Sequence, residues 1–325
     1  MTDEFDIIHR YFAPLTRGNT GAFGLSDDAA TLPVHPGFEH VITTDAIVQG
    51  VHFLTDEAPD NIATRLCACN LSDLASMGAR PLGFTLACAW SRDTDTDYIA
   101  AFAKGLGASV DAYDFPLLGG DTVTTSGPMM FSLTAIGEVE AGRALRRNAA
   151  SPGDTVYVSG TIGDGALGLL AAQGKLGALQ DGHRQFLEER YRRPTPRIET
   201  GRNLIGRAHA CIDISDGLIQ DLGHICETSS VSMQIEAAKV PLSEAARAAV
   251  ATDPALLNVI LSGGDDYELA FTGTNITDLD VPVTAIGTVS AASAGTRGTA
   301  GVAVLGADGH VIALEKSGYN HFSAS

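Results

Sequence analysis

Acidic side chains that could hold metal ions recur in short motifs through the first half of this sequence. Four of these motifs are Ser26-Asp27-Asp28, Thr43-Thr44-Asp45, Asn70-Leu71-Ser72-Asp73 and Gly119-Gly120-Asp121-Thr122. A carboxylate beside an apolar strand or within an apolar helix is costly unless it has a partner. The chain has only 21 Lys and Arg against 39 Asp and Glu, so hard cations are the expected partners. Mg²⁺ suits this role because it binds carboxylate oxygens together with waters and phosphates.

Any one of these motifs, taken alone, is better explained as local structure. Asp73 would cap a helix or face solvent, and Asp27-Asp28 would be turn residues. The occurrence of all four together favours a metal site instead. Asn70 and Asp73 are three positions apart on a predicted helix, so they share a face and can point into one site.

Two further acidic motifs occur in the second half, Ile212-Asp213-Ile214-Ser215-Asp216-Gly217 and Ser262-Gly263-Gly264-Asp265-Asp266-Tyr267-Glu268. The first follows a predicted strand and precedes a helix, whose N-terminus favours anions. The glycines of the second let the backbone come close to a ligand. Carboxylates alone repel a triphosphate, but Mg²⁺ ions between the two can hold it and neutralise charge during phosphoryl transfer.

Basic residues that could assist are confined to two regions. Arg147, in the run that begins at Arg143, lies near the predicted domain junction and is a candidate for contact with a nucleotide phosphate. The arginines between residues 190 and 197 are expected to form surface ion pairs.

Three familiar motifs are excluded or weak. Gly174-Lys175 is followed by Leu176, so there is no P-loop, and the protein-kinase signatures are also absent. If ATP binds, it therefore binds in another fold. The run from Gly163 to Gly168 matches the dinucleotide fingerprint, but no second strand ending in an acid follows, so a tight strand-to-helix turn is the interpretation. Cys67 and Cys69 point to different faces of a helix, which favours packing over metal binding.

The apolar periodicity predicts alternating helices and strands in both halves. In the first half, helices are expected at 3–12, 59–77 and 94–110 and strands at 38–44, 51–54, 82–90, 116–118 and 129–136, with residues 119–122 in a loop. In the second half, strands are expected at 154–159, 210–214, 231–235, 267–271, 284–289 and 302–305. Helical segments are expected from 164, across 183–207 and at 217–227, and a hairpin connection at 295–301.

Length and composition place these elements in two α/β domains with mixed sheets. A chain of 325 residues exceeds the usual size of one core, and the break at residues 149–153 predicts domains 1–148 and 149–325. A net charge of −18 argues against nucleic acid and anionic membranes as partners. No leader or membrane-spanning run is evident, and five cysteines without zinc spacing predict a reduced, cytoplasmic location.

Taken together, the motifs resemble one known family nearly from end to end. They are Phe23-Gly-Leu-Ser-Asp-Asp28, Thr43-Thr-Asp45, Val51-His-Phe53, Asn70-Leu-Ser-Asp73, Gly119-Gly-Asp121, Ile212-Asp-Ile-Ser-Asp-Gly217, Ser262-Gly-Gly-Asp-Asp-Tyr-Glu268 and Gly318-Tyr-Asn-His-Phe322. This set, in this order, is similar to that of the thiamine-monophosphate kinases, in the superfamily of aminoimidazole ribonucleotide synthetase. The resemblance implies transfer of the ATP γ-phosphate to thiamine monophosphate, giving thiamine diphosphate, with several Mg²⁺ ions along the phosphates.

The resemblance also implies roles for individual residues. The metal ligands would be Asp28, Thr43, Thr44, Asp45, Asp73, Asp121, Asp213 and Asp216. The nucleotide would contact Gly120, Asp121, Arg147 and Ser215, and the thiamine phosphate would contact His52, Asp265 and Tyr319. An aromatic ring at 319 suits the thiazolium cation, whereas His52 alone would more often be structural. No general base is expected, because the attacking phosphate oxygen is already ionised.

One departure from the family pattern is Asp265, where a Glu is usual, so the carboxylate is retracted by one methylene. The resemblance further implies a PurM-like architecture in which the N-terminal domain forms a homodimer through its sheet. Two alternatives are a nucleotide-binding subunit without turnover and another ATP-using enzyme of the superfamily. The selenophosphate enzyme would carry a reactive Cys before Cys67, and the hydrogenase-maturation protein would end in a Cys rather than in Phe322-Ser-Ala-Ser.

Overall fold

The computed structural model describes residues 4–292, 301–314, 316 and 318–320. Most of the predicted connection at 295–301 therefore lies outside the described residues. His321 and Phe322, at the end of the last motif, also lie outside them. The chain forms two compact units. The N-terminal unit comprises the chain up to Leu74 with Ala79–Gly142, and the C-terminal unit comprises Ala75–Gly78 with the chain from Arg143 onward.

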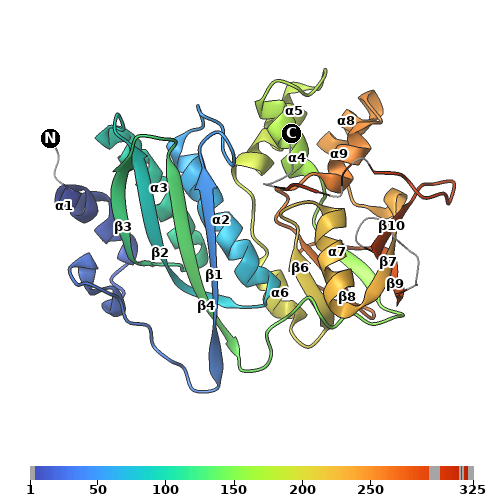
Figure 1. The fold of residues 1–325 in the computed structure, drawn as a ribbon, viewed down its shortest axis with the longest axis horizontal. Helices are drawn as coiled ribbons and strands as arrows, with labels where there is room; N and C mark the ends of the chain where they lie inside the picture. The colour runs from blue at the N-terminus through green and yellow to red at the C-terminus, as the bar shows by residue number, and fades with distance from the viewer. Residues whose placement is uncertain (1–3, 293–300, 315, 317, 321–325) are drawn as a thin grey trace. The chain divides into compact units, whose positions relative to one another are not determined.

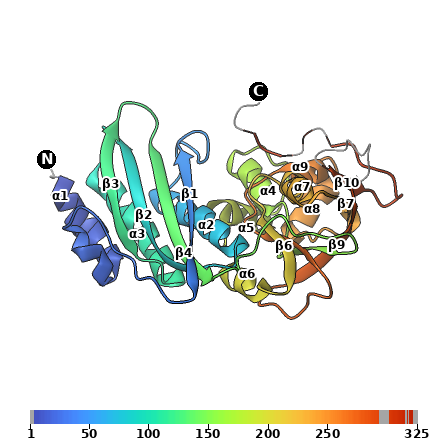
Figure 2. The ribbon, with the colours of Figure 1, turned by 60° about the horizontal axis from the view of Figure 1, so that its bottom comes forward.

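A four-stranded sheet organises the N-terminal unit. Its strands are β1 (Phe38–Val48), β4 (Met130–Glu140), β2 (Arg80–Ser91) and β3 (Leu117–Thr125), in that spatial order. Only β2 and β3 run parallel. Helices α2 (Pro59–Ser76) and α3 (Thr96–Tyr113) cover one face (Figures 1 and 2). Alternate residues of β2, among them Phe84, Leu86 and Trp90, are buried, as expected for a sheet with one covered face.

Short helical turns at the start of the chain pack beside β3. They are α1 (Glu4–Ile7), the π-helical segment Ile8–Phe12 and the 3₁₀ segments Ala13–Thr16 and Thr20–Leu25. The second and third of these contact α3, and the last two contact β3. Buried Phe12 and Leu15 anchor the segment, which brings Asp27 and Asp28 to the edge of the sheet.

Two predictions for this unit are wrong. Residues 51–54 form a turn rather than a strand, because Gly50 has φ +79° and the His52 N–H bonds back to the Val48 carbonyl. Residues 119–122 lie within β3 rather than in a loop. The glycine pair suggested a turn, but Gly120 instead allows β3 to approach β2 closely. The helices predicted at 59–77 and 94–110 are confirmed to within a few residues.

A six-stranded mixed sheet forms the centre of the C-terminal unit, in the order β10-β7-β9-β5-β8-β6. The strands are β5 (Thr155–Ser159), β6 (Ala208–Asp213), β7 (Val231–Glu236), β8 (Leu269–Gly273), β9 (Val283–Ala291) and β10 (Val302–Leu305). The pair β7–β10 is parallel and the other pairs are antiparallel. All six strands were expected from the apolar pattern.

The helices of this unit are α4 (Asp164–Ala172), α5 (Asp181–Arg192), α6 (Ile198–Leu204), α7 (Leu218–Ser229), α8 (Glu244–Thr252) and α9 (Leu256–Ser262), with a 3₁₀ turn at Ala237–Lys239. Helix α7 contacts β6, β7, β8 and β10 (Figure 1). Its Leu222 and Ile225 join Val156, Val158 and Ile212 in one buried core. Within the described residues, no helix is both long and apolar enough to cross a membrane.

Candidate active site

The first group of predicted site residues lies between β1 and α2. The Thr43 hydroxyl donates to the Asp73 carboxylate at 2.5 Å, and the Asp45 N–H donates to the Asn70 side-chain oxygen at 3.1 Å. The Asn70 amide nitrogen in turn donates to the Leu66 carbonyl at 3.0 Å. Asn70 and Asp73 therefore act from one face of α2, as their spacing predicted. The structure brings Thr43, Asp45 and Asp73 together and adds Asn70 as the residue that ties β1 to α2.

The Thr44 side chain points to the opposite face of the sheet from that of Thr43, because consecutive residues of a strand face opposite sides. Its hydroxyl donates to the Leu133 carbonyl at 3.1 Å and accepts from the Thr134 hydroxyl at 3.0 Å. The Thr44 side chain is therefore not brought to Asp73. The alternation of side chains along a strand predicts, from sequence alone, that Thr43 and Thr44 face opposite sides of the sheet.

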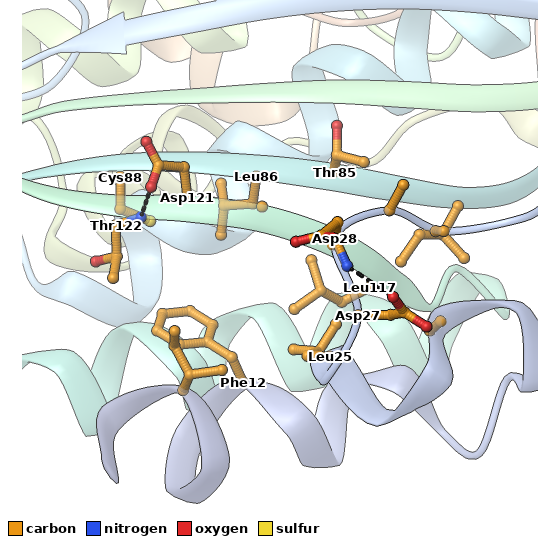
Figure 3. Close-up of a pocket in the computed structure, with 17 residues that line it drawn as sticks. Phe12, Leu25, Asp27, Asp28, Thr85, Leu86, Cys88, Leu117, Asp121 and Thr122 are labelled. Carbon is orange, nitrogen blue, oxygen red and sulfur yellow. Dashed lines mark hydrogen bonds between the residues drawn. The ribbon is translucent and has the colours of Figure 1, made fainter. Parts of the chain in front are cut away.

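The second group surrounds a cavity of about 350 Å³ at the β3 edge of the sheet (Figure 3). Apolar side chains line much of it, and Asp28, Gly120 and Asp121 lie on its wall. The Asp121 carboxylate accepts the Thr122 N–H at 2.9 Å, and the Asp28 N–H donates to Asp27 at 3.1 Å. The structure thus brings Asp28 together with Gly120 and Asp121, although the chain separates them by about ninety residues. A cavity with an apolar lining and a few polar groups is typical of a small-molecule site.

Asp121 and Thr122 point to opposite sides of β3 (Figure 3). Thr122 accepts a hydrogen bond from the Trp90 indole at 2.8 Å, on the side of the helices. Asp121 pairs in register with exposed Ala87, on the side away from them. Because β4 and β2 lie between β1 and β3, this chain by itself keeps the Asp45 and Asp121 groups apart.

Gly120 occupies a position that admits no side chain. A Cβ there would lie 2.0 Å from the Leu86 carbonyl oxygen, whereas a Cβ at Gly119 would meet nothing within 4 Å. Gly120→Ala should therefore push β3 away from β2 beside Asp121 and lower the free energy of unfolding by about 1–3 kcal/mol, the usual cost of overpacking. Gly119→Ala is the matched control and should change it by less than about 0.5 kcal/mol. Urea denaturation of both variants measures this, and equal stabilities would contradict the assigned close contact.

His52 is held by the turn that follows β1. Its Nδ1 accepts the Val48 N–H at 3.0 Å, so in the neutral ring the proton resides on Nε2. This bond gives His52 the structural role that a lone histidine more often has. Contact with a substrate remains a prediction for it.

In the C-terminal unit, main-chain hydrogen bonds join three predicted motifs into one assembly. The Ser215 carbonyl accepts the Asp265 N–H at 2.9 Å, and the Asp216 carbonyl accepts the Tyr319 N–H at 3.0 Å. The Gln220 amide donates to the Asp216 carboxylate at 3.2 Å and to the Tyr319 carbonyl at 2.8 Å. Ser215, Asp216, Asp265 and Tyr319 are therefore neighbours, and Asp213 lies next to them at the buried end of β6.

The glycines of these motifs serve the contact between the two loops. A Cβ on Gly264 would lie 2.0 Å from the Ser215 carbonyl oxygen, and one on Gly217 would lie 2.6 Å from that of Ser262. Close approach to a ligand was the expectation, but the close approach observed is to the chain's own backbone. Asp265 has φ +72°, a left-handed conformation that Asp adopts more readily than most residues.

Asp221 is a residue of this assembly that the motif analysis missed. Its Oδ2 accepts the N–H groups of Ser215, Asp216 and Gly217 at 3.0–3.1 Å. Burial, together with the charge of Asp216, raises the pKa of Asp221 to about 7. The signal available in the sequence was an acid in the first turn of a helix that directly follows a candidate motif.

Asp266 and Glu268, from the same motif as Asp265, support the candidate site from the protein interior. Asp266 is fully buried and accepts the N–H groups of Gly163 and Gly165 at 2.7 and 3.0 Å; its burial raises its pKa well above the usual value. These bonds occupy the N–H groups that a dinucleotide phosphate would need. The tight turn predicted between β5 and α4 is confirmed.

The expectation of surface ion pairs between residues 190 and 197 is wrong for two arginines. Arg190 and Arg197 are largely buried, and both donate to Glu268, which is fully buried and also accepts from Ser159 at 2.6 Å. This pairing could not be predicted from local sequence, because Glu268 lies 71 residues from Arg197 and 78 residues from Arg190 along the chain.

Arg147 lies at the other end of α7 from the Ser215 loop. Its carbonyl accepts the hydroxyls of Thr228 and Ser229 at 3.0 and 2.8 Å, and its side chain is exposed. The structure does not bring the main chain of Arg147 to Ser215. A nucleotide contact through its long side chain remains a prediction.

The donor atoms offered by the predicted metal ligands are carboxylate and hydroxyl oxygens, which suit Mg²⁺. Within the part of the chain that the structure describes, no group of three or more His, Cys, Asp or Glu residues is close enough together to hold an ion. The ligand assignment therefore remains a prediction.

All five cysteines are buried free thiols, and burial raises the pKa of Cys67 to about 12, in keeping with packing.

Both units match a known class of proteins. The family described as AIR synthase related protein, N-terminal domain, matches residues 26–139, and its C-terminal counterpart matches residues 151–295. The chain thus has the two-domain, mixed-sheet architecture that was predicted. A thiamine-monophosphate kinase of Caulobacter vibrioides is 45% identical over 82% of this chain and 75% of its own length. The chain belongs to the thiamine-monophosphate kinase family.

Two solved structures agree with this assignment. The thiamine-monophosphate kinase of Stenotrophomonas maltophilia is 39% identical, with a TM-score of 0.80 over 93% of this chain and 97% of that one. The structure of AaThiL complexed with AMPPCP and TMP is 29% identical, with a TM-score of 0.78 over 94% of this chain and 98% of that one. Family membership thus confirms the resemblance inferred from the motifs.

Proposed function

We propose that this protein phosphorylates thiamine monophosphate, transferring the γ-phosphate of ATP to give thiamine diphosphate and ADP. The observation that carries the proposal is the similarity, over 94% of the chain, to a structure complexed with both AMPPCP and TMP. The motifs on which the family resemblance rests are gathered here into compact groups at β1–α2, at the β3 cavity and at the β6–α7 loop. Their grouping supports a working site rather than scattered surface acids.

The cavity beside β3 is the proposed nucleotide site in the N-terminal unit. Its apolar lining, which includes Phe12 and Leu86, can take a nucleobase, and Gly120 presents bare backbone on its wall. In the C-terminal unit, Ser215 is proposed to contact the nucleotide. Asp265 and Tyr319 are proposed to meet the thiamine phosphate, since the half-exposed ring of Tyr319 can face the thiazolium cation.

Mg²⁺ ions are proposed to be held by Asp28, Thr43, Thr44, Asp45, Asp73 and Asp121 in the first unit and by Asp213 and Asp216 in the second. When bound, they supply neutralisation of charge on the phosphates. The chain's own contribution is positioning: Asn70 ties the Asp45 strand to α2, and the loop bonds fix Ser215 and Asp216. No side chain needs to remove a proton, because the accepting phosphate is ionised.

Product analysis by chromatography tests the proposal. Purified protein with ATP, Mg²⁺ and thiamine monophosphate should form thiamine diphosphate and ADP, with no product in EDTA and none from free thiamine. Tight ATP binding without product would instead support the alternative of a nucleotide-binding subunit without turnover.

We further propose a homodimer formed through the uncovered face of the N-terminal sheet. Ile42 and Val123 are 66% and 51% exposed in the single chain, and apolar side chains on a sheet face favour burial against a partner. Ile42→Asp should convert the dimer to a monomer in light scattering. Val34→Asp, at a position 78% exposed outside the sheet strands, is the control and should stay dimeric. A wild-type monomer, or a dimer that survives Ile42→Asp, would contradict this interface.

The free thiols are in keeping with the proposed cytoplasmic location.

A further inference from the structure

Three consecutive N–H groups converge on one buried oxygen at the start of α7. The Oδ2 atom of Asp221 accepts the N–H of Ser215 at 3.1 Å, of Asp216 at 3.1 Å and of Gly217 at 3.0 Å. Asp221 is only 3% exposed. An array of N–H groups at a helix N-terminus is the usual place for a phosphate to bind. Here the chain's own carboxylate fills that place.

The carbonyl groups of the same loop are occupied as well. Those of Ile214, Ser215 and Asp216 accept the N–H groups of Tyr267, Asp265 and Tyr319, at 2.8, 2.9 and 3.0 Å. The main chain of the loop is thus bonded within the protein on both sides. What the loop can offer a ligand is therefore its side chains, the Ser215 hydroxyl and the Asp216 carboxylate, which are both partly exposed.

The neighbouring helix repeats the arrangement. Asp266 takes the N–H groups of Gly163 and Gly165 at the start of α4. The two helix starts flank Asp265, since a Cβ on Gly165 would lie 2.2 Å from the Asp265 carbonyl and the Asp265 N–H reaches Ser215. An internal carboxylate therefore occupies N–H groups at both helix N-termini beside this motif.

We propose that Asp221 is a positioning residue that locks the 215–217 loop and closes its N–H groups to phosphate. Phosphate recognition at this loop then depends on the Ser215 hydroxyl and on a cation at Asp216. This inference rests on the proposed function for its kinetic consequence, but its structural content, loop locking and exclusion of phosphate, stands apart from the identity of the substrate.

Two variants of Asp221 and one control test the locking. Asp221→Asn keeps an acceptor oxygen and removes the charge, whereas Asp221→Glu keeps the charge and displaces the oxygen by a methylene. Glu227→Gln removes an exposed carboxylate from the same helix and serves as the control. Both Asp221 variants should speed hydrogen exchange at the 215–217 amides, and the control should not. Unchanged exchange in both variants would overturn the proposal.

Metal binding separates positioning from a merely structural role. Mn²⁺ affinity, measured by electron paramagnetic resonance, and kcat/KM for thiamine monophosphate should each fall about 10- to 100-fold in the Asp221 variants, as when residues behind metal ligands are changed. Faster exchange with wild-type Mn²⁺ affinity and kcat/KM would reduce Asp221 to a structural cap and overturn the proposal.

Inorganic phosphate probes the exclusion directly. In metal-free buffer it should leave the amide resonances of residues 215–217 unmoved in the wild-type protein, and a saturating shift there would contradict the exclusion. If the wild-type protein failed to phosphorylate thiamine monophosphate, the proposed function would fail, while the exchange, Mn²⁺ and phosphate measurements would still decide the role of Asp221.

Discussion

Replacing Asp121 by Asn should lower kcat by about 100-fold or more while the protein stays folded, since loss of one group that stabilises charge in the transition state has an effect of this size. Asp121 lies on the cavity wall, and its side chain is exposed rather than part of the core, so its charge can be removed without a packing change. Steady-state kinetics with ATP and thiamine monophosphate gives kcat, and circular dichroism verifies the fold.

Asp45→Asn should behave in the same way, because Asp45 is proposed to hold Mg²⁺ and its backbone N–H bond to Asn70 does not involve the carboxylate. Asp93→Asn is the control, since it removes an exposed charge from the loop before α3. Wild-type turnover in either Asp121→Asn or Asp45→Asn would refute the metal-ligand assignment of that residue.

Glu268→Gln should lower the free energy of unfolding by about 3–5 kcal/mol, the cost of breaking a buried ion pair by removing one partner. Glu268 is fully buried, and its carboxylate accepts hydrogen bonds from Arg190 at 3.0 Å and Arg197 at 2.7 Å. The substitution removes the negative charge to which both of these largely buried guanidinium groups donate. Urea denaturation followed by circular dichroism measures the loss.

The surface pair Glu199–Arg202 supplies the control for that measurement. Its side chains are 63% and 42% exposed, so Glu199→Gln should cost less than about 1 kcal/mol. If Glu268→Gln were as mild as Glu199→Gln, the buried network would not stabilise the unit in the way described.

Local patterns predicted those features of the fold that depend on neighbouring residues. The period of apolar residues located α2, α3 and, apart from most of β3, the strands of both sheets, because burial of one face imposes that period. Asn70 and Asp73 were placed on one face of α2 from their spacing alone. The strand predicted from residue 267 begins at Leu269 instead, because Asp265 and Tyr267 adopt positive φ angles of 72° and 52°. These φ angles could not be predicted from the residue types.

Contacts between distant segments could not be read in the same way. Asp266 lies 103 residues from Gly163, and Glu268 lies 71 residues from Arg197, and nothing in either local sequence identifies the partner. Residues 119–122 are predicted as a loop but form part of β3, where a Cβ on Gly120 would meet the carbonyl of Leu86 on the adjacent strand. The acidic motifs and the family resemblance thus supplied the candidate ligands, and the tertiary fold determined which of them meet.

The central claim is direct transfer of the ATP γ-phosphate to the phosphate of thiamine monophosphate, and a single turnover with [γ-³²P]ATP tests it most directly. Protein in excess over labelled ATP, with Mg²⁺ and thiamine monophosphate, should place the label in the terminal phosphate of thiamine diphosphate and leave unlabelled ADP. Release of the label as inorganic phosphate, formation of AMP, or retention of the label in ATP would contradict the proposed reaction.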